Sequence, residues 1–273
     1  MLRFFMRFPE GRKKAFTLSY DDGVKSDIRF LEIINKYGLK STFNLNAGIA
    51  KTNQFNRLSL DECSCYEGHE IATHGYTHPF LSHLPPEVAT YEIARDRMEL
   101  EENLGRIIRG HAYANGAYDE KSKEILKNTG IEYARGVKST HNFSIPKDFL
   151  EWQPTCHHSD EKLFDLIKEF LVWSPSGESL LFYLWGHTYE FDSGKERNNW
   201  EHADEFCSKI AGHEDTVWYA TNIEICDYIN AYKQLRFSMN ARLVYNPTCT
   251  DLWIGPYASE ESVKIPKGET VRI

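Results

Sequence analysis

The sequence predicts an α/β protein, a (β/α)7-type barrel with a small β-rich extension at its C-terminus. Short apolar runs typical of buried strands alternate with segments whose apolar residues recur at helical spacing. The sequence shows no glycine-rich nucleotide-binding turn, which favours a barrel over an open sheet. After about residue 236 the helical spacing stops, and only short β segments follow.

The alternation can be followed from residue 14 to residue 235. KAFTLSYDD at 14–22 is the first strand, and the helix expected at 27–40 places Leu31 and Ile34 on one face. Further strands are expected at residues 41–46, 69–75, 106–114, 131–137, 179–187 and 216–222. Further helices are expected at residues 85–105, 119–130, 160–173, 199–212 and 223–235. We therefore expect residues 1–235 to form the barrel and residues 236–273 a separate β extension.

Composition narrows the class of function. The net charge of -8 argues against nucleic acid or an anionic membrane as the main partner. Arg3 and Arg7 break the N-terminal apolar run, and no stretch approaches the roughly 18 apolar residues of a membrane span. The six cysteines form no CxxC pair, so we expect free thiols. Together these features predict a cytoplasmic protein with no signal peptide and no membrane segment.

Polar residues follow three of the expected strands, where the functional residues of a β/α barrel lie. Asp21 and Asp22 end the first strand, His74 and His78 follow the strand HEIA, and His187 follows SLLFYL. Alone, a DDG sequence is commonly a surface turn, and an HxxxH spacing occurs by chance. Together, two imidazoles and a carboxylate can hold one metal ion and leave a position open for water. The combination predicts a metal site.

The segments LSYDDG, THGYTH, AYANGAYD and LWGH resemble the successive motifs of the polysaccharide deacetylases, carbohydrate esterase family 4. The resemblance covers roughly residues 13–235 and implies an irregular barrel of about seven strands. It also implies one divalent metal ion, with zinc suiting the ligands and cobalt, nickel or iron as alternatives. Carried over residue by residue, it makes Asp21 the general base and His187 the general acid. Asp22, His74 and His78 become the metal ligands.

The third motif, AYANG, departs from the family pattern. The resemblance implies that the Asn115 backbone N–H helps to hold the oxyanion and that Tyr113 lies near the substrate. The family commonly has an arginine, which pairs with the catalytic aspartate, where this chain has Ala112. Arg109 and Arg135 are candidates for the missing partner.

A fainter fourth motif, DFLEW, carries Glu151 and Trp152. Trp152 lines the acetyl pocket in one interpretation and is a packed loop residue in the other. In PTCHH, Cys156 can be read as a nucleophile, although packing is the preferred role, and His157 and His158 have no assigned role. Glu190, which follows His187, either orients a loop, contacts substrate or is a solvated acid.

The metal site and the family resemblance together imply a metal-dependent hydrolase that removes an acyl group, expected to be N-acetyl, from a carbohydrate. Its partner would be a carbohydrate or a small acylated substrate, with no nucleic acid and no membrane. Two alternatives stay open. One is a hydrolase of non-sugar C–N bonds, such as ureides or imides, on the same scaffold. The other is a non-catalytic carbohydrate-binding protein.

Overall fold

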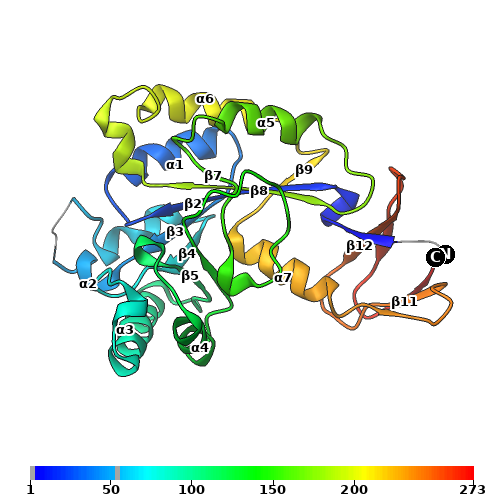
Figure 1. Ribbon diagram of the computed structural model, residues 1–273, viewed down its shortest axis with the longest axis horizontal. Coiled ribbons are helices and arrows are strands. Elements are labelled where there is room, and N and C mark those ends of the chain that lie inside the picture. The colour runs from blue at the N-terminus through cyan, green and yellow to red at the C-terminus, as the bar shows by residue number, and fades with distance from the viewer. Residues whose placement is uncertain (1–3, 53–55) are drawn as a thin grey trace.

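The computed structural model describes residues 4–52 and 56–273. The strands of its main sheet are β2 (Lys14–Asp21), β3 (Ser41–Leu45), β4 (Glu70–Thr73), β5 (Gly110–Ala112), β6 (Tyr133–Arg135), β7 (Cys156–His157), β8 (Leu180–Gly186) and β9 (Val217–Tyr219). They pair in the order β6–β5–β4–β3–β2–β8–β7, and β9 also pairs with β2 (Figure 1). All of these pairs are parallel. The predicted α/β barrel class is confirmed.

Strand β2 lies at the centre of the sheet and delivers polar groups to one of its faces. Successive side chains of a strand point to opposite faces. Leu18 and Tyr20 pack in the largest apolar core. Ser19 and Asp21 point to the opposite face of the sheet. There the Asn44 amide on β3 donates to the Ser19 hydroxyl and to the Asp21 carboxylate, each at 2.8 Å. The strand therefore ends with a buried carboxylate at its carboxyl end.

A single short segment joins the two edges of this sheet. Trp152 forms a parallel bridge with Arg135 at the end of β6, and β7 pairs with β8 a few residues later. One stretch of chain thus contacts both edges, which explains why the barrel is irregular.

The helices are α1 (Ser26–Lys36), α2 (Ala47–Ala50), α3 (Pro86–Leu104), α4 (Glu120–Asn128), α5 (Leu163–Val172), α6 (Trp200–Ile210) and α7 (Asn222–Tyr232). In Figure 1, α1, α5 and α6 gather on one side of the sheet, and α3 and α4 lie side by side on another. Among the residues that the structure describes, no helix is both long and apolar enough to span a bilayer.

Local sequence sets where the helices begin and end. At the start of α7, the Glu224 side chain accepts the backbone N–H of Thr221 at 2.8 Å, while the Thr221 side chain caps the helix in return. Helix α3 ends at Gly105, whose φ of 63° lies in the left-handed region that glycine adopts without a Cβ penalty.

The remaining strands are β1 (Phe4–Arg7), β10 (Arg236–Phe237), β11 (Leu243–Tyr245), β12 (Leu252–Pro256), β13 (Val263–Ile265) and β14 (Thr270–Arg272). They form two three-stranded antiparallel sheets, β1–β12–β13 and β10–β11–β14. The N-terminal strand therefore lies in the same sheet as the C-terminal segment. Tyr228 of α7 links this sheet to the barrel, because its hydroxyl donates to the Arg7 carbonyl at 2.6 Å and accepts from the Trp253 N–H at 3.1 Å. The division of the chain at residue 235 stays a prediction.

Candidate active site

The five side chains that the sequence singled out lie close together at the carboxyl ends of the strands. Asp21 ends β2, and Asp22 follows it. The Nε2 atoms of His74 and His187 lie 3.7 and 3.9 Å from Asp21 Oδ2. His78 Nε2 lies 3.8 Å from Asp22 Oδ1. Three strand ends that are far apart in the sequence thus contribute to one cluster.

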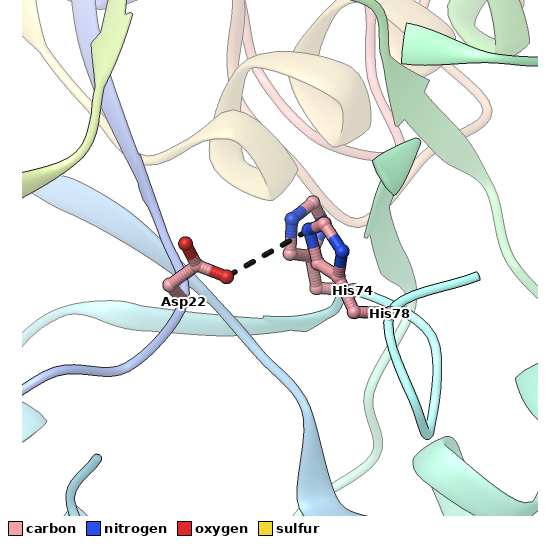
Figure 2. Close-up of side chains that lie close together, drawn as sticks. All are labelled: Asp22, His74 and His78. Carbon is pink, nitrogen blue, oxygen red and sulfur yellow. Dashed lines mark ion pairs between the residues drawn. The ribbon is translucent and has the colours of Figure 1, made fainter. Parts of the chain in front are cut away.

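Asp22, His74 and His78 form a candidate metal centre. Each offers one ligand atom, and these atoms all lie within 4.8 Å of one another. Figure 2 shows the Asp22 carboxylate facing both imidazole rings, with its contact to His78 dashed. Two imidazoles and one carboxylate are a ligand set that zinc uses in catalytic sites, where it keeps a further position open.

Hydrogen bonding fixes the tautomer of His74 in the form that a metal requires. Its Nδ1 lies 2.7 Å from the Ala112 carbonyl, which can only accept, so Nδ1 carries the proton and Nε2 keeps its lone pair. Burial lowers the pKa of His74 and outweighs the opposite effect of Asp21 and Asp22. The buried Asp96 carboxylate accepts the backbone N–H of His74 at 3.0 Å. The ring is therefore neutral and held in place.

The backbone is unusual at two of the three candidate ligands. Asp22 has a φ of 88° and His78 a φ of 60°, a region that residues other than glycine rarely adopt. Such conformations cost about 1–3 kcal/mol each and cluster at functional sites. Gly23 follows with a φ of 62°, and a Cβ there would lie 2.6 Å from Leu45 Cδ2. The tight exit from β2 thus favours glycine at this position.

Arg57 also contacts Asp22, and the sequence gave no signal for it. Its guanidinium donates to the Asp22 carbonyl, and Nη1 lies 2.8 Å from Asp22 Oδ1. Oδ1 is buried, and no donor among the described residues has the geometry of a hydrogen bond to it. A carboxylate offers about four acceptor positions, so this one can bind a cation while Arg57 stays in place. The donor set therefore fits one divalent metal ion.

Asp21 has its own partner, which is Arg135. Nη2 of Arg135 contacts both oxygens of the Asp21 carboxylate, at 2.6 Å for Oδ1, and both side chains are buried. Arg135 ends β6, where its Cα pairs in register with that of Ala112 on β5. Arg109, the other candidate, instead pairs with Glu132 and Asp227 at the surface. The guanidinium that the third motif lacks is thus supplied by the neighbouring strand.

This pairing keeps Asp21 ionised. Burial alone would raise the pKa of Asp21, but Arg135, His74 and His187 outweigh it and hold that pKa well below its usual range. Arg135 is fixed in turn, because its guanidinium lies 4.4 Å from the centre of the Trp185 ring and donates to the Gly136 carbonyl at 3.0 Å. Asp21 is therefore a negatively charged carboxylate beside the candidate metal centre, with a cationic partner of its own.

His187 lies between Asp21 and a second carboxylate. Its Nδ1 is 3.3 Å from Glu190 Oε1, while Nε2 points toward Asp21. Burial alone would lower the pKa of His187, but Glu190 and Asp21 outweigh it and raise this pKa. The other oxygen of Glu190 lies 3.2 Å from His157 Nε2 and 2.9 Å from His158 Nε2. Glu190 is therefore a member of the site and not a solvated acid.

The remaining predicted residues lie at the edges of the cluster or beneath it. Asn115 is exposed and has a φ of 57°. Tyr113 is buried, and its hydroxyl donates to the Leu150 carbonyl at 3.0 Å. Trp152 is 1% exposed and packs against Tyr133 and Tyr183. So little exposed surface favours packing over the acetyl pocket for Trp152, and the substrate roles of all three residues stay predictions.

Two further residues are placed away from the chemistry. Glu151 forms an ion pair with Lys123 at 2.5 Å. Cys156 is buried, and burial raises the pKa of its thiol, which disfavours the nucleophile interpretation.

Known proteins resemble this chain in part of its sequence and in its fold. Residues 9–134 match the model of the family described as "Polysaccharide deacetylase". This match covers a little under half of the chain, and the matched segment resembles the polysaccharide deacetylase family. The matched segment carries Asp21, Asp22, His74 and His78, whereas His187 lies beyond it. No curated protein matches the chain.

Solved structures share the fold. A putative polysaccharide deacetylase from Mycobacterium smegmatis is similar with a TM-score of 0.59 and 17% identity, over 83% of this chain and 93% of that one. A family 4 carbohydrate esterase from Streptomyces lividans, in complex with acetate, has a TM-score of 0.52 and 14% identity, over 77% and 93%. A pseudoenzyme of the same esterase family from Bacillus anthracis has a TM-score of 0.54 and 17% identity, over 82% and 68%. At these identities the likeness shows the fold alone.

Proposed function

We propose that this protein is a metal-dependent hydrolase that removes an acyl group, most simply N-acetyl, from a carbohydrate. One observation carries the proposal. The adjacent carboxylates Asp21 and Asp22 have separate partners, since Asp22 faces His74 and His78 while Asp21 pairs with Arg135. One carboxylate is thereby available for a metal ion and the other for proton transfer.

The candidate metal ligands are Asp22, His74 and His78, and zinc suits them, with cobalt, nickel or iron as alternatives. When bound, a divalent ion supplies a Lewis acid that polarises a carbonyl and lowers the pKa of water toward about 7. The protein residues would hold this ion in a fixed position. Ala112, through its carbonyl, would keep His74 in the correct tautomer.

In this mechanism the remaining residues move protons and orient the substrate. Asp21, ionised beside Arg135, would accept the proton of the attacking water. His187 would donate a proton from Nε2 to the leaving amine nitrogen as the C–N bond breaks. The backbone N–H of Asn115 would donate to the developing oxyanion. The products would be acetate and a free amino sugar.

The structure weakens one of the two alternative functions, and the comparisons offer a precedent for the other. The ureide and imide interpretation rested partly on the missing arginine, and Arg135 now supplies a guanidinium to Asp21. The non-catalytic interpretation has a precedent in fold, because one structural neighbour is described as a pseudoenzyme. The set of Asp21, Asp22 and three histidines in one cluster favours catalysis over both alternatives.

The test is an assay of acetate release from N-acetylated sugar oligomers, run beside a panel of ureides and imides. We expect turnover on the sugars, and loss of activity with retained metal in Asp21→Asn. Substituting Asp22, His74 or His78 by alanine should remove the bound metal, measured by elemental analysis. Turnover of ureides alone, or unchanged metal content in all three variants, would refute the proposal.

A further inference from the structure

Glu190 is surrounded by three imidazole rings, and its two oxygens face different ones. Oε2 lies 3.2 Å from His157 Nε2 and 2.9 Å from His158 Nε2, while Oε1 lies 3.3 Å from His187 Nδ1. His158 is fully buried and Glu190 is mostly buried. These contacts are ion-pair distances, since neither Glu190 Oε2 nor His187 Nδ1 has a partner with hydrogen-bond geometry among the described residues. Two histidines thus face one side of the carboxylate, and His187 faces the other.

The neighbours of Glu190 are themselves fixed. His158 Nε2 lies near two acceptors, Glu190 and the Asn198 side-chain oxygen at 3.2 Å, so Nε2 carries the proton. A Cβ on Gly186 would lie 1.9 Å from His158 Nδ1, so only glycine fits at this end of β8. His157 is held on its other side by the Ser159 hydroxyl, 2.8 Å from Nδ1.

We propose that Glu190, held by His157 and His158, is the positioning residue of His187. It orients the Nδ1–H of the ring and compensates its positive charge, so that Nε2–H faces the leaving group above Asp21. This inference rests on the proposed hydrolase function. The ionised state of Glu190 supports it, because its three histidine contacts outweigh burial and lower its pKa. A general acid of this kind contributes about 10²–10⁴-fold to the rate.

The same atoms allow a competing interpretation. His157, His187 and Glu190 also lie within 4.8 Å of one another and could hold a second cation. A cation on Nδ1 of His187 would take the place of the proton that Glu190 orients. The two interpretations therefore predict different metal contents.

The experiment compares Glu190→Gln, which removes the charge and keeps an acceptor, with Glu190→Ala, which removes both. The matched control is Glu151→Gln, because Glu151 pairs with Lys123 and has no contact with His187. Each protein is assayed on an N-acetylated sugar oligomer and on 4-nitrophenyl acetate, whose leaving group needs no proton. We expect Glu190→Gln to lower kcat on the oligomer by about 10–100-fold with little change in KM. Loss on the activated ester should stay below about 3-fold, and the control should match the wild type on both.

A second readout does not depend on turnover. In ¹⁵N-histidine-labelled protein, the wild type should show a protonated, hydrogen-bonded Nδ1 on His187, and this signal should shift or vanish in Glu190→Ala. An unchanged signal overturns the proposal even if the wild type proves inactive, an outcome that would separately refute the hydrolase function. Equal losses on both substrates, or two metal ions per wild-type chain and one in Glu190→Gln, would also overturn it.

Discussion

The pair of Arg135 and Asp21 allows the sharpest test of how the site is built. We consider Arg135→Met, which keeps an apolar stem against Trp185 and removes the guanidinium. Asp21 would then stay buried without its compensating cation, with the Asn44 amide at 2.8 Å as its remaining side-chain donor among the described residues. The substitution therefore isolates the charge of Arg135 from its packing.

The magnitude follows from burial. The side chains of Arg135 and Asp21 are 0% and 3% exposed, so water screens the pair very little. Removing one partner of a buried pair costs about 3–5 kcal/mol, because the other charge is left uncompensated. For a domain of this size that lowers Tm by on the order of 10 °C. Arg109→Met is the matched control, and its exposed pairs should be worth about 1 kcal/mol or less.

The assay is a double-mutant cycle with Asp21→Asn, read by urea unfolding at neutral pH. Replacing both charges leaves no unpaired carboxylate, so the double variant should recover about 2–3 kcal/mol relative to the sum of the two single variants. If Arg135→Met costs no more than Arg109→Met, or if the two changes are additive, Arg135 does not compensate Asp21.

The register between β5 and β6 allows a second test of the same pair. Ala112 and Arg135 pair in register on parallel strands, so their side chains leave the sheet on the same face. We expect the double change Ala112→Arg and Arg135→Ala to restore part of the acetate release that Arg135→Ala alone removes. Ala112→Arg alone should be destabilising, because Ala112 is fully buried and the space is occupied.

Three further predictions concern the metal, a buried carboxyl and a loop. Zinc at 100 times its Kd should stabilise the folded wild type by about 2.7 kcal/mol and so raise its Tm. The Tm of His74→Ala should not rise, and thermal scans with and without chelator would show the difference. Burial raises the pKa of Glu70 to about 7, above its unfolded value, so the wild type should lose about 2 kcal/mol between pH 5 and pH 8 as this group ionises. Glu70→Gln should lack that loss in urea titrations, and equal pH slopes would contradict the assignment. Gly116→Ala should destabilise more than Gly105→Ala, since both have positive φ but only at Gly116 would the added Cβ lie within 4 Å of a neighbour, 2.3 Å from Val137 Cγ2.

Much of the barrel could be predicted because its signals are local. The strand ending at Asp21 and the helix α3 ending at Gly105 follow from apolar spacing and from glycine chemistry. Strand β1 could not be predicted in this way, because its partner β12 lies near the opposite end of the chain. Pairing between such distant segments depends on how they pack and leaves no periodicity in either sequence.

Some residues of the candidate site could also be predicted from the sequence, and others could not. Asp22, His74 and His78 were found because each follows a strand, and strand ends converge in a barrel. Arg57 was missed because nothing in its own segment indicates what it contacts, and Glu190 was named with its role left open. Glu190 had one usable signal, which was its position one helical turn after His187, where an i, i+3 contact can form.

Asp21 shows why a charge partner cannot be assigned from motif spacing alone. The carboxylate requires a guanidinium at a given point in space, and two adjacent parallel strands in register offer that point equally well. Arg109 is nearer to Ala112 in the sequence, yet it lies at the surface, while Arg135 on the next strand reaches Asp21. A motif that lacks its arginine is therefore incomplete only when the neighbouring strand lacks one too.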